Sequence, residues 1–395
     1  MDKIDEVLTR GVEQILPSRQ GLENLLRSKK RIRLYLGIDP TATRLHLGHT
    51  IPLRKLQEFA ELGHEAILLF GTGTVLVGDP SERDSGRQLI TQKEIEENIA
   101  TWKDQVKNIV DFKKIKIKFN GDWLTKLTLK DIIRIGSKIS AIQLFKRDNF
   151  TKRIQKGDTV YFHETMYPLL QGYDSVVMDV DLEIGGTDQT FNMLMGRELQ
   201  KKIRNREKYV LTMKMILGTD GHTMSKSSGN CVWLTDTPQD IYGKLMRLPD
   251  ELIPDYFEVF TAYTTFEIKK IKTELQKPDI NPMTYKKKLA FEITSQLHRK
   301  KLADEAQREF EKVVQEKAIP HNARQVELLK SQWKIVDLIM RFSLAASNSE
   351  AKRLIRQGGV LLGNRKVTNP QEIIKIEKDT VLKVGKRNFL KIRVI

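Results

Sequence analysis

Apolar, β-rich runs alternate with helical stretches over the first 230 residues, and this pattern restricts the fold more than any other feature of the chain. The runs that we predict to be strands lie at residues 33–38, 65–70, 114–119 and 175–180. Helical periodicity separates them, as at 94–110, where Thr91 and Glu94 form a capping box ahead of the helix. Such alternation is typical of an α/β domain with a mostly parallel sheet and helices on both faces.

The strand signal disappears from about residue 235 to residue 329. Charged amphipathic helices take its place, and we predict two of them at residues 266–275 and 285–299. This change of pattern indicates a separate helical domain.

The tail of the chain has a third pattern, with predicted helices at 335–342 and 351–357 followed by short β runs. Ser347 and Glu350 have the spacing of a second capping box, and Gly358 ends the helix that they begin. We therefore predict an α/β domain, an α-helical domain and a small α+β domain. Their expected ranges are 1–232, 233–330 and 331–395.

Positive charge is concentrated in the last of these regions. The whole chain has 68 Lys and Arg against 51 Asp and Glu, a formal net charge of +17. Residues 331–395 alone carry 14 basic and 5 acidic side chains, a net charge of +9. A solubilising surface would scatter its lysines, so this compact block favours a nucleic-acid partner.

The single cysteine and the first residues restrict the environment. Cys231 has no partner for an intramolecular disulfide or a thiolate metal cluster, which suits a reducing cytoplasm. The first 17 residues mix charged with apolar side chains, so we expect neither a signal peptide nor a membrane anchor. We predict a cytoplasmic protein with no membrane partner.

The segment YLGIDPTATRLHLGHT at 35–50 ends a predicted strand and opens a helix near His46 and His49. The carboxyl edge of such a sheet is where ligands bind. Imidazoles at a helix N-terminus can donate to phosphate oxygens, the helix dipole favours negative charge there, and Gly48 leaves room for a nucleotide. The same residues can also be an ordinary helix start, so this segment alone does not decide between the two.

A second segment, at 218–230, is a loop rich in glycine and serine with Lys226 at its centre. A lysine on a mobile, glycine-flanked loop can move onto a triphosphate as charge develops during reaction. By itself the loop reads as a solvated surface turn. Together with the histidine segment in one α/β domain, it favours a nucleotide site.

These two segments resemble the two signatures of class I aminoacyl-tRNA synthetases, here HLGH at 46–49 and TMSKS at 223–227. The resemblance is closest to the bacterial tyrosyl branch and covers essentially the whole chain. Further matching segments are VGDPS at 77–81, YPLLQGYD at 167–174 and EIGGTDQ at 183–189. One departure is that Thr223 stands where the family has the first lysine of its second signature.

The resemblance implies a Rossmann-like catalytic domain, a helical domain on the anticodon side and a ribosomal-protein-type RNA-binding domain. The implied reaction joins tyrosine to ATP as tyrosyl-adenylate and then transfers tyrosine to the 3′-terminal ribose of tRNA. ATP is expected to bring Mg²⁺ as its substrate complex, with no dedicated metal site on the protein. Family members are homodimers, so a second copy is an expected partner.

Tyrosine recognition is assigned through the resemblance to six residues. Three of them, Tyr167, Gln171 and Asp174, have the i, i+4, i+7 spacing of one helix face. Asp79, Tyr167 and Gln171 are expected at the substrate ammonium. Tyr35 and Asp174 are expected at the far end of the substrate side chain, and Gln189 at its carboxyl group.

Nucleotide and RNA contacts follow from the same resemblance. Catalysis is assigned to Thr41, His46, His49 and Lys226. The predicted ATP and adenylate contacts are Gly37, Asp39, His46, Gly48, His49, Gly186, Asp188, Met224, Ser225 and Lys226. The stretch 183–189 is expected to follow a strand and enter a helix, with its glycines close to the ribose. The predicted RNA contacts are Lys352, Arg353, Arg356, Arg365 and Lys366.

Three alternatives stay open at the level of sequence. A tryptophan-specific synthetase is one, because Asp174 can accept from an indole N–H, although an indole offers Tyr35 no acceptor. A small-molecule nucleotidyltransferase shares the histidine segment but gives no reason for the basic tail. An RNA-binding protein on a synthetase scaffold is the third, and Thr223 favours it slightly.

Overall fold

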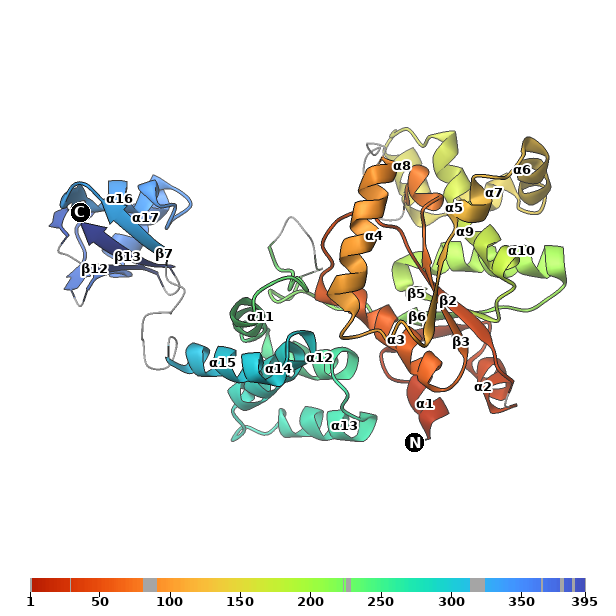
Figure 1. The fold of residues 1–395 in the computed structure, drawn as a ribbon, viewed down its shortest axis with the longest axis horizontal. Coiled ribbons are helices and arrows are strands. Elements are labelled where there is room, and N and C mark those ends of the chain that lie inside the picture. The colour runs from red at the N-terminus through yellow and green to blue at the C-terminus, as the bar shows by residue number, and fades with distance from the viewer. Residues whose placement is uncertain are drawn as a thin grey trace. The chain divides into compact units, whose positions relative to one another are not determined.

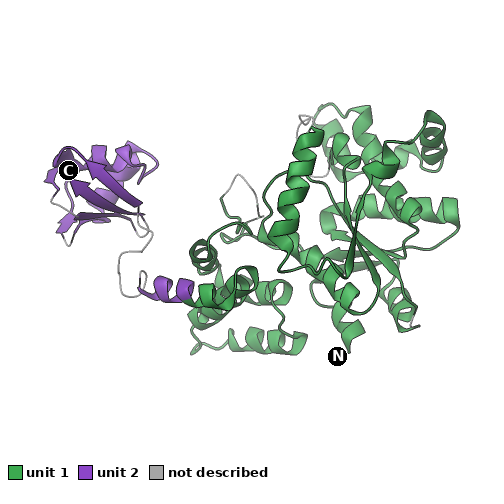
Figure 2. Ribbon diagram, viewed as in Figure 1, with its two compact units in different colours: residues 1–304 green, residues 305–395 purple. Residues whose placement is uncertain are grey.

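The structure, a computed structural model, describes residues 2–28, 30–80, 91–222, 224, 229–312, 324–363, 365–376, 380–385 and 388–394 (Figure 1). The chain forms two compact units, unit 1 (Met1–Asp304) and unit 2 (Glu305–Ile395), shown in green and purple in Figure 2. The region expected at 1–232 lies within unit 1. The helical region expected at 233–330 is divided between the two units after Asp304. Within the described residues, no helix is long and apolar enough to cross a bilayer.

Unit 1 is built around a six-stranded sheet with the order β1-β6-β5-β2-β3-β4. Its strands are β1 (Val12–Leu16), β2 (Arg33–Ile38), β3 (Glu65–Phe70), β4 (Ile115–Phe119), β5 (Leu182–Gly186) and β6 (Tyr209–Met213). All neighbours pair in parallel except β1, which runs antiparallel to β6. Helices cover both faces of the sheet (Figure 1), so the α/β fold expected from the alternation is confirmed.

The helices of the sheet region are α1 (Lys3–Val7), α2 (Arg19–Arg27), α3 (Thr50–Glu61), α4 (Gln92–Val106), α5 (Gly121–Leu124), α6 (Leu129–Gly136), α7 (Ala141–Phe145), α8 (Asp148–Gln155), α9 (Phe162–Met178) and α10 (Thr190–Arg204). The capping box of Thr91 and Glu94 is present at the start of α4, although the helix ends at Val106 rather than at residue 110. After β6 the chain is helical, with α11 (Pro238–Leu245), α12 (Ile253–Phe260), α13 (Thr265–Glu274), α14 (Pro282–Leu297) and α15 (Lys300–Phe310).

The strand predicted at residues 175–180 is wrong, because this run is the last part of helix α9. Leu170, Asp174 and Met178 are all buried at helical spacing, and the helix ends at Asp179, whose φ of 50° is left-handed. An apolar run of this length fits a strand or a buried helix equally well. The strand in this region is β5, and its apolar pattern is interrupted by a buried charged residue, Glu183. The stretch 183–189 therefore begins inside a strand instead of following one.

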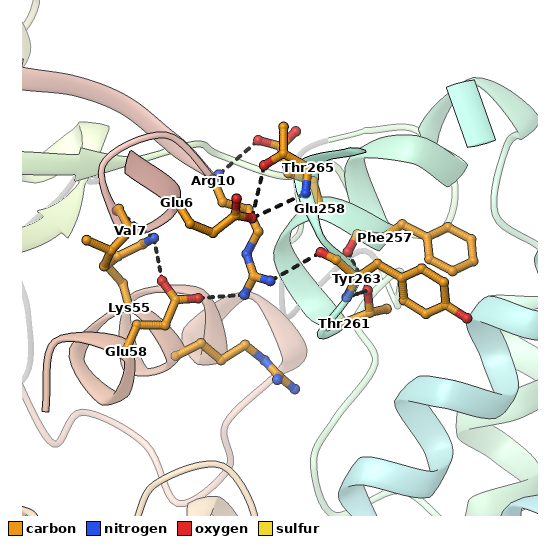
Figure 3. A network of polar contacts seen from close by, with 12 residues as sticks. Glu6, Val7, Arg10, Lys55, Glu58, Phe257, Glu258, Thr261, Tyr263 and Thr265 are labelled. Atoms are coloured by element: carbon orange, nitrogen blue, oxygen red, sulfur yellow. Dashed lines mark hydrogen bonds and ion pairs between the residues drawn. The ribbon is translucent and has the colours of Figure 1, made fainter. Parts of the chain in front are cut away.

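A network of polar contacts ties the helices after β6 to the sheet region (Figure 3). Arg10 donates to Glu58 on α3 at 2.5 Å and to the backbone oxygen of Tyr263 at 3.3 Å. Glu6 on α1 accepts from the backbone and the hydroxyl of Thr265, at 3.2 and 3.0 Å. Lys55, buried on α3, donates to Glu58 at 2.6 Å. These contacts connect α1 and α3 with the start of α13 inside unit 1.

Unit 2 contains a five-stranded sheet with the order β10-β9-β12-β13-β7 and a two-stranded sheet of β8 and β11. Its elements are β7 (Arg324–Leu328), β8 (Gln332–Lys334), α16 (Ile335–Arg341), α17 (Asn348–Arg356), β9 (Val360–Leu362), β10 (Arg365–Val367), β11 (Ile373–Lys375), β12 (Thr380–Val384) and β13 (Asn388–Val394). Buried side chains such as Leu338, Ile355 and Leu390 form its own core.

Two details of unit 2 differ from the sequence interpretation. Strand β7 pairs in parallel with β13, so the terminal sheet includes residues ahead of 331, where only helices were expected. Ser347 caps α17 by accepting from the backbone N–H of Glu350 at 3.2 Å. The Glu350 carboxylate, however, accepts from the backbone of Ala346 at 2.7 Å rather than from Ser347, so the reciprocal half of the box is not formed.

Helices α9 and α10 approach closely at Gly172, where a methyl group would lie 3.0 Å from the backbone nitrogen of Gly196. We expect Gly172→Ala to destabilise the protein by about 1–2 kcal/mol, because overpacking outweighs the roughly 1 kcal/mol that alanine gains over glycine in a helix. Chemical denaturation would measure the change. Gly243→Ala is the control, since Gly243 lies inside α11 with nothing within 4 Å of the added methyl, and it should be neutral or stabilising. The same sign for both variants would contradict the packing argument.

Candidate active site

A cavity of about 420 Å³ opens where the central parallel strands end. Residues that follow β2, β5 and β6 line it, which is the edge where ligands bind in open parallel sheets. Every small-molecule contact predicted from the sequence lines this cavity if it falls within the described residues. These residues are Tyr35, Gly37, Asp39, Thr41, His46, Gly48, His49, Asp79, Tyr167, Gln171, Asp174, Gly186, Asp188, Gln189 and Met224. Ser225 and Lys226 lie outside the described residues.

The histidine segment forms a single 3-10 turn, Leu47–His49, before α3 begins at Thr50. His46 stands at the N-cap position in extended conformation, and its ring centroid lies 3.8 Å from that of His49. A methyl group at Gly48 would lie 3.1 Å from the His46 ring, so glycine leaves space beside the two imidazoles. Both rings thus stand at a helix start that faces the cavity, an arrangement suited to binding an anion.

The chain that follows the glycine- and serine-rich loop returns to the histidine segment. The backbone N–H of Leu47 donates to Val232 at 2.8 Å, and that of Leu234 donates to Leu45 at 2.9 Å. Within the loop, the sulfur of Met224 lies 3.6 Å from where a methyl group of Gly48 would be. The two segments, far apart in the sequence, therefore meet at one wall of the cavity.

A positively charged side chain, that of Arg44, lies at this junction. The Arg44 guanidinium lies 4.7 Å from the ring centre of Trp233 and donates to the side chains of Thr235 at 2.9 Å and Asp236 at 3.2 Å. Arg44 also lines the cavity, and the sequence interpretation did not include it. An arginine stacked on an aromatic ring is held in place by cation–π attraction as well as by its hydrogen bonds.

Two buried polar groups, Tyr35 and Asp174, line the inner part of the cavity, with 0% and 1% of their surface exposed. Asp174 accepts from the amide of Asn120 at 2.9 Å and from the indole of Trp123 at 2.8 Å. Burial raises the pKa of the Asp174 carboxyl well above its ordinary value, and these two hydrogen bonds oppose that rise. The Tyr35 hydroxyl lies 2.9 Å from the hydroxyl of Ser175.

The other polar side chains of the cavity are connected in pairs. Tyr167 donates to Asp39 at 3.0 Å, and burial raises the pKa of the Tyr167 phenol. Gln189 donates to Asp79 at 2.8 Å, and Arg147 donates to the same carboxylate at 3.2 Å. The cavity therefore combines several carboxylates with a few fixed hydrogen-bond donors.

Gln171 has a defined orientation. Its amide nitrogen donates to the carboxylate of Glu183 at 3.1 Å, which fixes which end of the amide carries the oxygen. That oxygen is buried and has no hydrogen-bond partner among the described residues. A buried acceptor beside a cavity is costly unless a ligand donor fills it. Among the described residues, no group of three or more His, Cys, Asp or Glu side chains could hold a metal ion.

The predicted RNA contacts lie in unit 2, on two adjacent elements. Lys352, Arg353 and Arg356 are exposed on α17, and Arg365 and Lys366 are exposed on β10. The Lys366 side chain lies beside Gly358, which follows the end of α17, so the two groups are neighbours. Arg365 pairs with Glu372 at 2.5 Å and Arg353 lies 3.6 Å from Glu350, so these two cations are partly neutralised.

The sequence family described as class I tRNA synthetases (W and Y) matches residues 27–315, and the S4 domain matches residues 335–381. The chain belongs to the class I tRNA synthetases of this tryptophan and tyrosine group. It is 40% identical over 400 residues to a tyrosine–tRNA ligase of Carboxydothermus hydrogenoformans, with 98% of this chain and 97% of the relative covered. It is also 40% identical over 388 residues to one of Thermotoga maritima, with 98% and 96% covered.

Solved synthetase structures share the fold. A C-terminally truncated mitochondrial tyrosyl-tRNA synthetase of Aspergillus nidulans matches with a TM-score of 0.67 at 24% identity, covering 79% of this chain and 94% of that one. A tyrosyl-tRNA synthetase of Archaeoglobus fulgidus, solved in complex with L-tyrosine, matches with a TM-score of 0.62 at 19% identity, covering 77% and 98%.

Sequence reasoning missed three residues that donate to carboxylates of this synthetase pocket. Asn120, which lines the pocket, and Trp123 donate to Asp174, and Arg147 donates to Asp79. Asn120 carried a usable signal, because a polar residue directly after a strand of a parallel sheet lies at the ligand edge. Trp123 and Arg147 carried none, since each reaches its carboxylate partner only through the tertiary fold.

Removing the Asn120 amide should raise the pKa of Asp174 further, because this hydrogen bond favours the ionised carboxylate. A raised carboxyl pKa costs stability as the pH rises above the ordinary value. We therefore expect the loss of unfolding free energy in Asn120→Ala to grow as the pH rises above the raised pKa of Asp174 in the unmodified protein, towards the roughly 1.5–3 kcal/mol typical of a hydrogen bond to a charged group. Denaturation at several pH values measures it.

Two comparisons isolate the charge effect. In an Asp174→Asn background the pH-dependent part of the loss should vanish. Asn98→Ala is the matched control, because buried Asn98 donates to the neutral backbone oxygen of Pro40 at 2.8 Å and should give a pH-independent loss. A pH-independent loss for Asn120→Ala as well would contradict the assignment.

Proposed function

We propose that this chain is a tyrosine–tRNA ligase, which forms tyrosyl-adenylate and pyrophosphate from tyrosine and ATP and then transfers tyrosine to the 3′-terminal ribose of tRNA. One observation carries the proposal. The cavity joins a helix start with two imidazoles to an inner wall where Tyr35 and Asp174 are buried. Such a cavity suits one molecule with phosphates and another that ends in a phenol.

The inner wall accounts for the choice of amino acid. A phenol both donates and accepts hydrogen bonds, so its O–H can donate to Asp174 while the Tyr35 hydroxyl donates to its oxygen. Phenylalanine would leave both groups unpaired in a buried site, and sites of this kind reject the deoxy analogue by about 10⁴–10⁵. The indole N–H of tryptophan could donate to Asp174, but tryptophan offers no acceptor to the Tyr35 hydroxyl, so tyrosine is favoured as the substrate.

The remaining groups of tyrosine have partners of suitable chemistry nearby. The buried amide oxygen of Gln171 is an acceptor for the substrate ammonium, which Asp79 and Tyr167 would share. We assign the substrate carboxyl group to Gln189. Gly186 and Asp188 would face the ribose of ATP, and Gly37, Asp39 and Gly48 would line the adenylate.

Adenylate formation needs positioning and charge stabilisation more than proton transfer. The ionised carboxylate of tyrosine attacks the α-phosphorus of ATP, the bond to the bridging oxygen breaks, and pyrophosphate leaves with the electron pair. Thr41, His46, His49 and Lys226 would stabilise the charge that develops on the phosphates. Mg²⁺ would enter bound to ATP as part of the substrate. In the second step, a ribose hydroxyl of tRNA attacks the tyrosyl carbonyl carbon and AMP leaves.

Unit 2 would bind the tRNA through the exposed cations of α17 and β10. Its match to the S4 domain and its net charge both favour RNA phosphates as the partner. Transfer of an amino acid to tRNA is a step of protein synthesis, so we assign the protein to the cytoplasm.

A second copy of the chain is part of the proposal. Large apolar side chains are exposed on α6, α7, α8 and at the start of α9, including Leu129 at 75%, Ile142 at 71% and Phe162 at 80%. On the same segment Ile135, Ile139 and Leu144 are buried against α9 and α10, so an internal packing face is already present. A further exposed apolar face is typical of a protein interface, and a homodimer would cover it.

Pyrophosphate exchange tests the function. Mixed with ATP, labelled pyrophosphate and each amino acid in turn, the protein should exchange label into ATP only with tyrosine. Lys226→Ala should lower the rate by about 10²–10³ with tyrosine affinity nearly unchanged, as when one transition-state donor is lost. Exchange with tryptophan instead of tyrosine would indicate a tryptophan-specific synthetase. No exchange with any amino acid would favour an RNA-binding protein.

The RNA contacts are tested by charge removal on α17. The triple change Lys352→Gln, Arg353→Gln and Arg356→Gln should leave tyrosine-dependent exchange intact, weaken tRNA binding and make that binding less sensitive to salt. Each lost phosphate contact lowers the salt slope by about 0.9 or less. The control removes three exposed lysines of unit 1, Lys93, Lys107 and Lys113, and should leave binding nearly unchanged. Equal effects from both triples would refute a specific role for α17.

A further inference from the structure

A fully buried ammonium group lies beneath the tyrosine end of the cavity. Lys208, which precedes β6, has none of its surface exposed, and its ammonium lies 5.8 Å from the ring centre of Tyr35. It forms an ion pair with the buried carboxylate of Glu183. It also donates to the hydroxyl of Ser175 at 2.8 Å and to the backbone oxygen of Met193 at 3.1 Å.

The surrounding helices leave space for this group. A methyl group at Gly196 on α10 would lie 2.5 Å from the Lys208 ammonium and 2.7 Å from the Ser175 hydroxyl. Burying an ion pair costs several kcal/mol of desolvation per charge, and apolar side chains of similar volume often serve stability as well or better. Stability alone therefore does not explain the buried ion pair of Lys208, and its position beside the pocket indicates a role in the pocket itself.

We infer that Lys208 and Ser175 are positioning residues that fix the direction of the Tyr35 hydroxyl, and that they thereby set the discrimination between tyrosine and phenylalanine. This inference rests on the proposed function. The two residues reach the substrate only through Tyr35, and neither is a member of the catalytic set.

The direction follows from which groups can donate. A lysine ammonium has three donors and no acceptor, so the Ser175 oxygen must accept from it. The described contacts of the Ser175 hydroxyl are Lys208 and Tyr35, so its own proton is available for the Tyr35 oxygen. Ser175 then does not need the Tyr35 proton. The Glu183 carboxylate is also within hydrogen-bond reach of the Tyr35 hydroxyl, but its two oxygens already accept from Lys208 and Gln171. The Tyr35 proton is therefore directed to the phenol oxygen of the substrate. Asp174 accepts a hydrogen bond from the phenol O–H, so Tyr35, Ser175 and Asp174 all have partners.

The same lysine also supports the ammonium end of the pocket. Glu183 receives Lys208 on one oxygen and the amide nitrogen of Gln171 on the other, at 3.1 Å. This contact turns the Gln171 oxygen away from Glu183 and leaves it free of partners among the described residues. Lys208 therefore orients groups at both ends of the substrate, whereas Ser175 acts on the phenol end alone.

Ser175→Ala is the sharpest test, because it removes one oxygen and leaves the ion pair of Lys208 and Glu183 in place. Pyrophosphate exchange would give kcat/KM for tyrosine and for phenylalanine. We expect kcat/KM for tyrosine to fall by about 2- to 10-fold, the effect of one neutral hydrogen bond, with phenylalanine and the KM for ATP unchanged. In a Tyr35→Phe background, Ser175→Ala should cause no further loss of discrimination.

Lys208→Met should reduce discrimination as well and also weaken tyrosine binding through Gln171. Its control is Lys55→Met, since Lys55 is also buried and paired with a carboxylate, Glu58, but belongs to the network of Figure 3 and does not line the cavity. Lys55→Met should lower the melting temperature without changing the ratio of tyrosine to phenylalanine kcat/KM.

Two results would overturn the positioning role of Lys208 and Ser175 while the proposed function stands. One is a folded Ser175→Ala protein whose ratio of tyrosine to phenylalanine kcat/KM equals that of the unmodified protein. The other is a loss that persists undiminished in the Tyr35→Phe background, which would mean that Ser175 acts by packing. Absence of tyrosine-dependent exchange in the unmodified protein would instead overturn the proposed function itself, and with it the positioning role of Lys208 and Ser175.

Discussion

The parallel pairing of β2 with β3 on one side and β5 on the other is the constraint on which the site depends. Because all three strands run in the same direction, the segments that follow them emerge at one edge of the sheet. The segment after β2 supplies Asp39 and the histidine turn, and the segment after β5 supplies Asp188 and Gln189. The order of the strands changes direction at β2, and such a point is where open α/β sheets leave a crevice for ligands.

Inside this crevice the protein buries several polar groups, and their hydrogen-bond and ion-pair partners offset the cost of desolvation. Asp174 is held by Asn120 and Trp123, and Glu183 is held by Lys208 and Gln171. Partners of this kind offset desolvation, and they also fix each group in one orientation before a substrate arrives. Selectivity then follows from the same physics, since a ligand that lacks the matching group leaves a buried donor or acceptor unpaired.

The local parts of this arrangement could be predicted from the sequence, and the tertiary parts could not. The histidine turn, the strands β2 and β3 and the face of Tyr167, Gln171 and Asp174 follow from short-range spacing, and the structure places them together. The run at 175–180 was assigned to a strand because apolar content does not separate a buried helix from a buried strand. Nothing in the local sequence indicates that Lys208 is buried, since its burial depends on a space beside Gly196 that only the packed α9 and α10 create.

The same distinction between local and tertiary signals explains why unit 2 was only partly foreseen. Its basic composition is readable directly, because charge in one segment of chain requires no partner to be counted. Its sheet is different, since β7 is polar at most positions and gains its place only by pairing with β13, at the other end of the unit. Each unit has a core of its own, and the cavity is lined by residues of unit 1 alone. The chemistry of amino-acid activation and the charge that favours RNA are thus carried by separately folded parts of the chain, so a change on α17 alters neither the buried pairs nor the parallel strands that form the cavity.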